Sequence, residues 1–106
     1  MYKTDIIKAI ENQLMIRIHW KKETTGQYSE CDIAPYDIFP KTKKDSYHER
    51  DILLGVENEK FGYKDHVANI YLDTIQSVNI LNQNFDGDEV RRIINPKHNP
   101  IIHRNW

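Results

Sequence analysis

The N-terminal part of the chain carries apolar residues at the spacing of a helix. They recur every three or four positions on a single stripe, at Ile6, Ile7, Ile10 and Leu14. Thr4 can cap the first turn, because its hydroxyl can accept a hydrogen bond from a free backbone N–H group. We therefore expect an amphipathic helix over residues 5–14, with the stripe packed against the rest of the domain.

After this helix the apolar period changes to two, which is typical of a strand with one buried face. An alternating pattern or a short apolar run recurs in five segments, at residues 15–20, 28–34, 51–56, 67–72 and 78–81. Pro35 is expected to end the second strand, because proline lacks a backbone donor for the ladder. Gly55, inside the apolar run, predicts either a bulge or a close approach of another backbone.

The segments between and after these strands are mainly polar. Residues 35–50 contain two prolines and are expected to be mostly loop, and residues 57–65 are expected to be a turn. Beyond residue 81 a turn is followed by a segment, 89–94, that is long enough for a short helix. We expect residues 95–106 to form a loose tail, an extra edge strand or a contact arm.

One helix followed by several strands predicts a mainly β fold. No second helix lies between the strands, which argues against a parallel βαβ sheet and favours an antiparallel meander. Closing such a meander into a small barrel would remove its exposed edges. We therefore expect one domain, with the helix and a five-stranded barrel in residues 1–81 and a C-terminal extension of the same domain in residues 82–106.

Composition limits the partners of this domain. The chain has 106 residues, and its 15 basic and 16 acidic side chains give a net charge of -1. Such a balance creates no strong overall field, so any contact with nucleic acid must come from a local patch. Cys31 is the only cysteine, which excludes an intrachain disulfide and makes the cytoplasm the expected location. The sequence has no apolar leader or span, so we expect no export and no membrane partner.

Four sequence elements follow one another in an order that resembles the WYL domain. They are Ile16-Arg17-Ile18-His19-Trp20, Ile33-Ala34-Pro35-Tyr36, Leu53-Leu54-Gly55 and Ile70-Tyr71-Leu72-Asp73-Thr74-Ile75, and with the N-terminal helix they cover residues 5–81. The resemblance implies a five-stranded Sm-like barrel of the Src-homology-three type. It also implies that the domain senses a nucleic acid or a nucleotide-like ligand, since WYL domains usually occur in bacterial transcription regulators.

The chain departs from the WYL pattern at two places. Asp51-Ile52-Leu53 stands where the family has Trp-Tyr-Leu, and Thr74 stands where the family has a ligand-facing arginine. The chain also has no helix-turn-helix, because its N-terminal helix is followed directly by a strand. Direct reading of a promoter is therefore not expected.

Basic residues cluster in the segment 35–50, which also contains aromatic side chains. Cations bind phosphate and rings stack on bases, as a nucleotide or single-stranded nucleic acid requires. Two residues of the first strand can extend the patch, and one tyrosine at the start of the segment is the best candidate for an open stacking ring. The candidate binding residues are Arg17, His19, Tyr36, Lys41, Lys43, Lys44 and Arg50. The alternative is an ordinary solvated loop in which Asp45, Glu49 and Asp51 balance the lysines.

Other chemistry has less support in the sequence. Most of the remaining aromatic residues, such as Trp20 and Tyr71, have strand spacing and are expected in the core. The five histidines lack the spacing of a zinc motif and Cys31 has no partner, so we expect no metal site. No nucleophile elbow and no phosphate loop occur, so we expect no cofactor and no enzymatic activity.

Two functions therefore stay open. The first is a small regulatory module that binds a nucleotide or single-stranded nucleic acid on the candidate residues. The second is a module for protein interaction or homo-oligomerisation, in which a barrel edge, the helix stripe or the Trp106 tail meets another chain.

Overall fold

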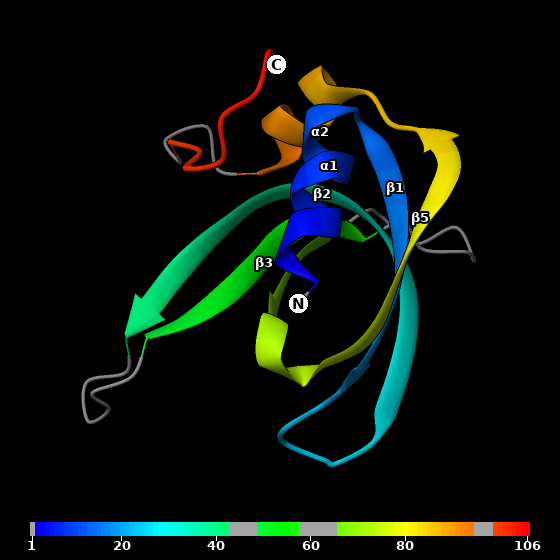
Figure 1. Cartoon of the computed structure of the whole chain (residues 1–106), viewed down its shortest axis with the longest axis vertical. Helices are drawn as coiled ribbons and strands as arrows, with labels where there is room; N and C mark the ends of the chain where they lie inside the picture. The colour runs from blue at the N-terminus through cyan, green and yellow to red at the C-terminus, as the bar shows by residue number, and fades with distance from the viewer. Residues whose placement is uncertain (1, 43–48, 58–65, 95–98) are drawn as a thin grey trace.

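The structure is a computed structural model, and it describes residues 2–42, 49–57, 66–94 and 99–106 (Figure 1). Its elements are α1 (Lys3–Glu11), β1 (Leu14–Lys21), β2 (Tyr28–Thr42), β3 (Glu49–Glu57), β4 (His66–Tyr71), the 3₁₀ turn η1 (Leu72–Thr74), β5 (Ile75–Asn84) and α2 (Gly87–Ile93). The helix, strands and short C-terminal helix appear in the predicted order. No helix in the described part of the chain is long and apolar enough to cross a membrane.

The five strands form one antiparallel sheet in the order β4-β3-β2-β1-β5. This confirms the mainly β fold with an N-terminal helix. The sheet is not closed, in contrast to the predicted barrel, because the edge strands β4 and β5 are joined through η1 without pairing to each other. Among the described residues, no further strand pairs with the outer side of β4 or of β5.

The second strand is much longer than its sequence predicts. Pro35 does not end it, and β2 continues through the expected loop as far as Thr42. Pro35 lies at a register shift of the β2–β3 ladder, between Pro35 and Asp37. A bulge is one of the few places where a strand tolerates a residue without a donor, since the ladder is interrupted there anyway.

A glycine next to this bulge allows the two strands to approach closely. Gly55 of β3 pairs with Pro35 on one side and with Ala68 on the other. A Cβ atom at Gly55 would stand 2.6 Å from the carbonyl oxygen of Ala34 and 2.8 Å from the Ile33 side chain. The predicted close approach at Gly55 is therefore confirmed.

Successive residues of the strands enter two cores, one on each face of the sheet. The first core contains Ile6 and Ile10 of α1 packed on Ile16, Ile18 and other inward residues. The second core lies on the opposite face and is covered by α2. It contains Met15, Ala34, Tyr36, Leu54, Val56, Val90 and Ile94. The C-terminal extension therefore supplies part of a core, and β5 runs across residue 82 without interruption.

The last residues of the chain pack against the domain beside α2, where the chain ends in red in Figure 1. The carboxylate of Asp37, which is fully buried, accepts hydrogen bonds from the backbone N–H groups of Ile101 (3.0 and 3.1 Å) and Ile102 (2.9 Å). The Trp106 indole donates to the Ile10 carbonyl oxygen at 2.7 Å. Residues 99–106 are thus neither a loose tail nor a strand, and we refer to them as the docked tail.

Candidate functional site

Arg17 lies on β1 and is held by carboxylates of β2. Its Nε is 2.7 Å from Asp32 Oδ1 and its Nη2 is 3.1 Å from Asp32 Oδ2, while Glu30 lies 3.8 Å from Nε. Arg17 and Asp32 are direct partners in the β1–β2 ladder. The hydrogen bond to Asp32 raises the pKa of Arg17 above its ordinary value. The charge of Arg17 is therefore balanced within the sheet.

His19 lies on the same strand, between a carboxylate and a hydroxyl. Its Nε2 forms an ion-pair contact with Glu30, and its Nδ1 is 2.9 Å from Ser77 Oγ. Glu30 and Ser77 are the direct ladder partners of His19 in β2 and β5. Glu30, His19 and Ser77 are thus connected in the order acid, base and nucleophile. The backbone of β1 is hydrogen-bonded to a neighbouring strand on both sides, so it offers few free N–H groups to stabilise an oxyanion.

Tyr36 is placed inside the second core. Its side chain is 2% exposed, and the Arg104 guanidinium lies 4.2 Å from the centre of its ring. The Trp106 ring packs edge-on against Tyr36, with ring centres 5.8 Å apart. Tyr36 is thus covered by the docked tail and does not offer an open face on which a base could stack.

The predicted lysine cluster is described only at its beginning. Lys41 is in β2, where its backbone pairs with Arg50 of β3. Lys43 and Lys44 lie outside the described residues. Their part in binding therefore stays a prediction, whereas Arg50 can be placed.

Arg50 connects three parts of the fold at the end of the sheet opposite α2. Its Nε is 2.7 Å from Asp73 Oδ2, its Nη2 is 2.6 Å from Asp73 Oδ1, and Nη2 also contacts Glu23 of the β1–β2 turn. The guanidinium lies 3.7 Å from the centre of the Tyr71 ring. Hydrogen bonds to Asp73 and Glu23 raise the pKa of Arg50 above its ordinary value. Arg50 thus binds two carboxylates, offsets one of their two negative charges and holds the turn against η1.

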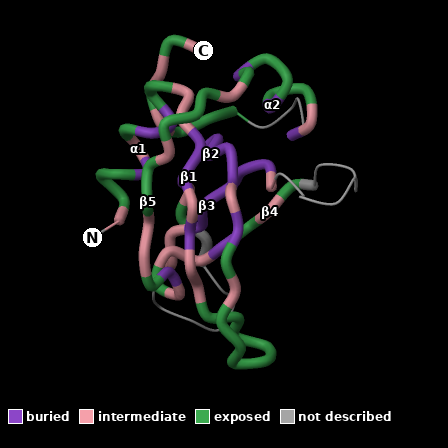
Figure 2. The backbone as a smooth tube through the Cα atoms, turned by 90° about the vertical axis from the view of Figure 1, so that its right-hand side faces the viewer, coloured by how far each residue is buried: buried purple, intermediate pink, exposed green. Residues whose placement is uncertain are grey.

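Two adjoining hollows lie beside this brace, and together we refer to them as the turn-end hollow. One has a volume of about 250 Å³ and is lined in part by Trp20 and Tyr71; the other has a volume of about 470 Å³ and is lined in part by Asp73 and Gln76. Both are lined by Lys21, Lys22, Glu23 and Thr74. Figure 2 shows the β1–β2 turn as an exposed loop at the foot of the molecule.

The two lysines are the most available cations of the turn-end hollow. Lys21 and Lys22 are both exposed, and neither forms an ion pair with another described residue. The Lys21 ammonium lies 5.9 Å from the centre of the Tyr28 ring, which leaves it open to solvent on its other sides. Lys21, Lys22 and Arg50 together outweigh Glu23 and Asp73 by one positive charge, so positive charge is available here for an anion.

Sequence reasoning missed these lysines because they look like ordinary turn residues. Lys21 ends β1, and Lys22 begins the turn whose Gly26 adopts a φ of 71°. The only signal in the sequence is a pair of lysines directly after a strand. The contact that makes them important, between Glu23 and Arg50, joins residues 27 positions apart and is not readable from spacing.

Metal binding has no support in the described part of the structure. Among those residues, no group of three or more His, Cys, Asp or Glu side chains could hold a metal ion. Cys31 is buried, and burial, with the Glu57 carboxylate as a second cause, raises the pKa of its thiol to about 12. A neutral buried thiol is a poor metal ligand and a poor nucleophile.

Comparison with known proteins shows a shared fold at low sequence identity. No protein-family model matches the chain, and no curated protein matches it. A solved structure, proteasome accessory factor B/C (PafBC) of Arthrobacter aurescens, matches with a TM-score of 0.60 and 20% sequence identity. The match covers 81% of this chain and 12% of that chain. At this identity the match shows a shared fold alone.

Proposed function

We propose that the chain is a WYL-like regulatory or binding module that takes a phosphate group in the turn-end hollow. The phosphate belongs to a nucleotide or to single-stranded nucleic acid. The observation that carries this function is the pair of ammonium groups at Lys21 and Lys22, which form no ion pair with a described residue and lie beside carboxylates that Arg50 binds. The fold match to PafBC supports a regulatory or binding module in general.

The hollow suits a small anionic ligand in size and in lining. Its larger part, about 470 Å³, falls in the range of about 300–1,000 Å³ that is usual for small-molecule sites. Trp20 and Tyr71 add apolar and aromatic surface beside the cations, as binding of a base requires. Lysine donates to phosphate as a point charge from a flexible stem, so it tolerates several ligand positions.

Thr74 gives this site a different charge distribution from the WYL pattern. Its hydroxyl donates to the Tyr71 carbonyl oxygen at 2.7 Å, and its short side chain lines both parts of the hollow. An arginine at this position would bring its own cation into the same space. We infer that Lys21 and Lys22 supply from the turn the charge that Thr74 does not supply from η1.

The segment that contains Lys43 and Lys44 leaves β2 at Thr42 and returns at Glu49, next to Arg50. The two lysines are therefore part of the proposal as an extension of the turn-end hollow. Arg17 and His19 are not part of it, because Asp32 and Glu30 balance them on a face of the sheet.

The test is charge reversal at the hollow with a matched reversal at the other end of the molecule. Binding of a short fluorescent oligo-dT is measured at low and at moderate salt for the wild type, Lys21→Glu/Lys22→Glu and Arg91→Glu/Arg92→Glu. Arg91 and Arg92 are exposed on α2, so the control changes the net charge equally. The hollow variant is expected to bind at least about tenfold more weakly and with a shallower salt dependence.

Equal weakening in both double variants would assign the binding to overall charge and contradict the proposed site. No binding by the wild type at low salt would contradict the proposed ligand class. Lys43→Glu/Lys44→Glu, measured in the same assay, decides whether the extension takes part. Circular dichroism of each variant shows that the fold is retained.

A second function, self-association, is favoured by the free edges of the sheet. Val67 on β4 and Ile80 on β5 are 38% and 41% exposed, and both edge strands can accept a further strand. The helix stripe and Trp106 are buried or half-buried in the domain, so the edges are the better contact surface. Sedimentation over a range of concentrations tests this function, and a strictly monomeric species would contradict it.

A further inference from the structure

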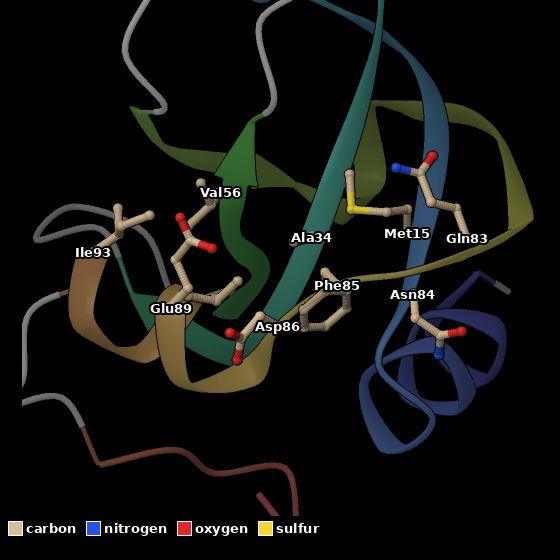
Figure 3. Close-up of a pocket in the computed structure, with 10 residues that line it drawn as sticks. Met15, Ala34, Val56, Gln83, Asn84, Phe85, Asp86, Glu89 and Ile93 are labelled. Carbon is tan, nitrogen blue, oxygen red and sulfur yellow. The ribbon is translucent and has the colours of Figure 1, made fainter.

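A separate hollow of about 180 Å³ lies at the other end of the sheet, between the strands and α2 (Figure 3). Its floor is apolar and belongs to the second core. Met15, Ala34 and Val56 contribute from three strands, and Val90 and Ile93 contribute from α2. With this volume the hollow is too small for a drug-sized ligand, but it is several times the space of a water molecule, about 30 Å³.

The rim of this hollow is acidic. Asp86 and Glu89 line it from the α2 side, across from Met15 (Figure 3). Asp86 also caps α2, with its Oδ1 accepting from the Asp88 N–H group at 3.0 Å. Among the described residues, the lining contains these two carboxylates and no lysine, arginine or histidine. An apolar floor with a negative rim is complementary to a cation on an aliphatic stem.

We propose that this hollow receives an arginine side chain of a partner polypeptide. The methylene stem packs on Met15, Val56 and Ile93, and the guanidinium reaches the carboxylates of Asp86 and Glu89. Arginine fits better than lysine because its planar fork can donate to two carboxylates at once. The inference is independent of the phosphate site, since the two hollows share no lining residue and, among the described residues, only the turn-end hollow is lined by lysines.

Met15 provides a direct readout for this contact. The chain has two methionines, Met1 and Met15, so methyl-labelled protein gives two resolvable signals. The probe is a blocked Gly-Arg-Gly peptide, with Gly-citrulline-Gly as the neutral control of nearly the same shape. The Met15 methyl signal is expected to shift saturably with the arginine peptide and not with the citrulline peptide, while the Met1 signal stays unchanged.

Two conservative variants test the carboxylates. In Asp86→Asn/Glu89→Gln the shape is kept, and asparagine can still cap α2. This variant is expected to weaken the Met15 response at least about tenfold, because it loses both charged partners. Asp5→Asn/Glu11→Gln, which removes two exposed carboxylates of α1, is the control and is expected to leave the response unchanged.

Four results would overturn the inference. One is the absence of a Met15 shift up to several millimolar arginine peptide. Another is an equal shift with the citrulline peptide, which would assign the contact to apolar packing alone. The third is a Met15 signal that changes with protein concentration in the absence of peptide, which would place a second copy of the chain in the hollow. Tighter binding of free methylguanidine than of the peptide would likewise assign the hollow to a small molecule and contradict the polypeptide partner.

Discussion

Two arginine–tyrosine pairs, one at each end of the sheet, show how the same contact can serve different purposes. At the docked tail, Arg104 lies 4.2 Å from the Tyr36 ring centre, and at the turn end Arg50 lies 3.7 Å from the Tyr71 ring centre. Arg104 is also 4.4 Å from the Trp106 ring and donates to the Tyr36 carbonyl oxygen. Arg50 instead binds two carboxylates at the surface.

The surroundings of the two guanidinium groups shift their pKa values in opposite directions. Burial lowers the pKa of Arg104, whose Nε and Nη2 are buried and have no hydrogen-bond partner among the described residues. Hydrogen bonds to Asp73 and Glu23 raise the pKa of Arg50. At the tail end, the guanidinium of Arg104 thus holds the end of the chain in place. At the turn end, the charges of Lys21 and Lys22 stay available beside the turn-end hollow. Substitutions at the docked tail should therefore mainly change the free energy of unfolding, and substitutions at the turn end should mainly change ligand binding.

The largest expected difference in stability between the two ends is that between alanine variants of two aspartates, Asp37 and Asp73. Asp37→Ala removes a buried carboxylate that accepts three backbone hydrogen bonds, so we expect a loss of about 3 kcal/mol in the free energy of unfolding. Asp73→Ala removes an exposed ion pair and is expected to cost less than about 1 kcal/mol. Urea denaturation of both variants measures the difference. Similar losses in the two variants would contradict the division between the ends.

Two glycines extend the comparison. A Cβ atom at Gly87 would stand 2.5 Å from Trp106 Cε3 and 2.8 Å from Gln13 Oε1, so Gly87→Ala must displace the docked tail. We expect a loss of about 2 kcal/mol, together with a change in Trp106 fluorescence. Gly26→Ala meets no atom within 4 Å and is opposed only by its φ of +71°, which costs about 1 kcal/mol. If Gly26→Ala proved the more harmful change, packing of the tail would matter less than the contacts suggest.

Cys31 lies in β2 between the two ends and links stability to pH. The pKa of its thiol is raised from 9.0 to about 12 in the folded protein, so folding favours the neutral thiol. The stabilisation is complete below pH 9.0 and is lost as the pH rises toward about 12. Between pH 8 and pH 10 we expect a loss of about 1 kcal/mol that is absent in Cys31→Val, as measured by urea denaturation at each pH. An equal loss in the valine variant would assign it to other groups.

The smallest expected effect on stability is at Arg50. Arg50→Met should change the free energy of unfolding by less than about 1 kcal/mol, since the ion pairs that it breaks are mostly exposed. The same change frees Glu23 and Asp73 beside Lys21 and Lys22, so binding of oligo-dT should weaken about tenfold. Denaturation and the binding assay together check both parts. Unchanged binding of oligo-dT would show that Arg50 does not contribute to the binding site.

The order of elements could be predicted from the sequence because it depends on local periodicity. The stripe of α1 and the alternation in β1 fix a face for each residue, and Gly55 marks a close approach that the structure contains. The continuation of β2 past Pro35 could not be predicted, because it depends on a bulge whose partner is on β3. Closure of the sheet was also expected and is absent, since it depends on how far β4 and β5 approach each other.

The candidate site was predicted only in part, for a related reason. Arg50 was named for its charge, but its role depends on Glu23 and Asp73, which are distant in sequence. Tyr36 was expected at the surface because it follows a proline, yet the docked tail covers it through contacts more than 60 positions away. Arg17 and His19 face carboxylates whose ladder register cannot be read from composition. The sequence indicates which residues are candidates for binding. Only the fold shows which other residues they contact.

The most direct test of the turn-end hollow as the ligand site is a map of backbone amide shifts during titration with a short oligo-dT. We expect the largest shifts in residues 20–26 and 69–76, which contain the lining residues of both parts of the hollow. Residues 30–32 and 87–93 should shift little, because Glu30 and Asp32 pair with Arg17, and Asp88 and Glu89 offset the charges of Arg91 and Arg92. Largest shifts on the β2 face or on α2, with none around Lys21 and Lys22, would contradict it.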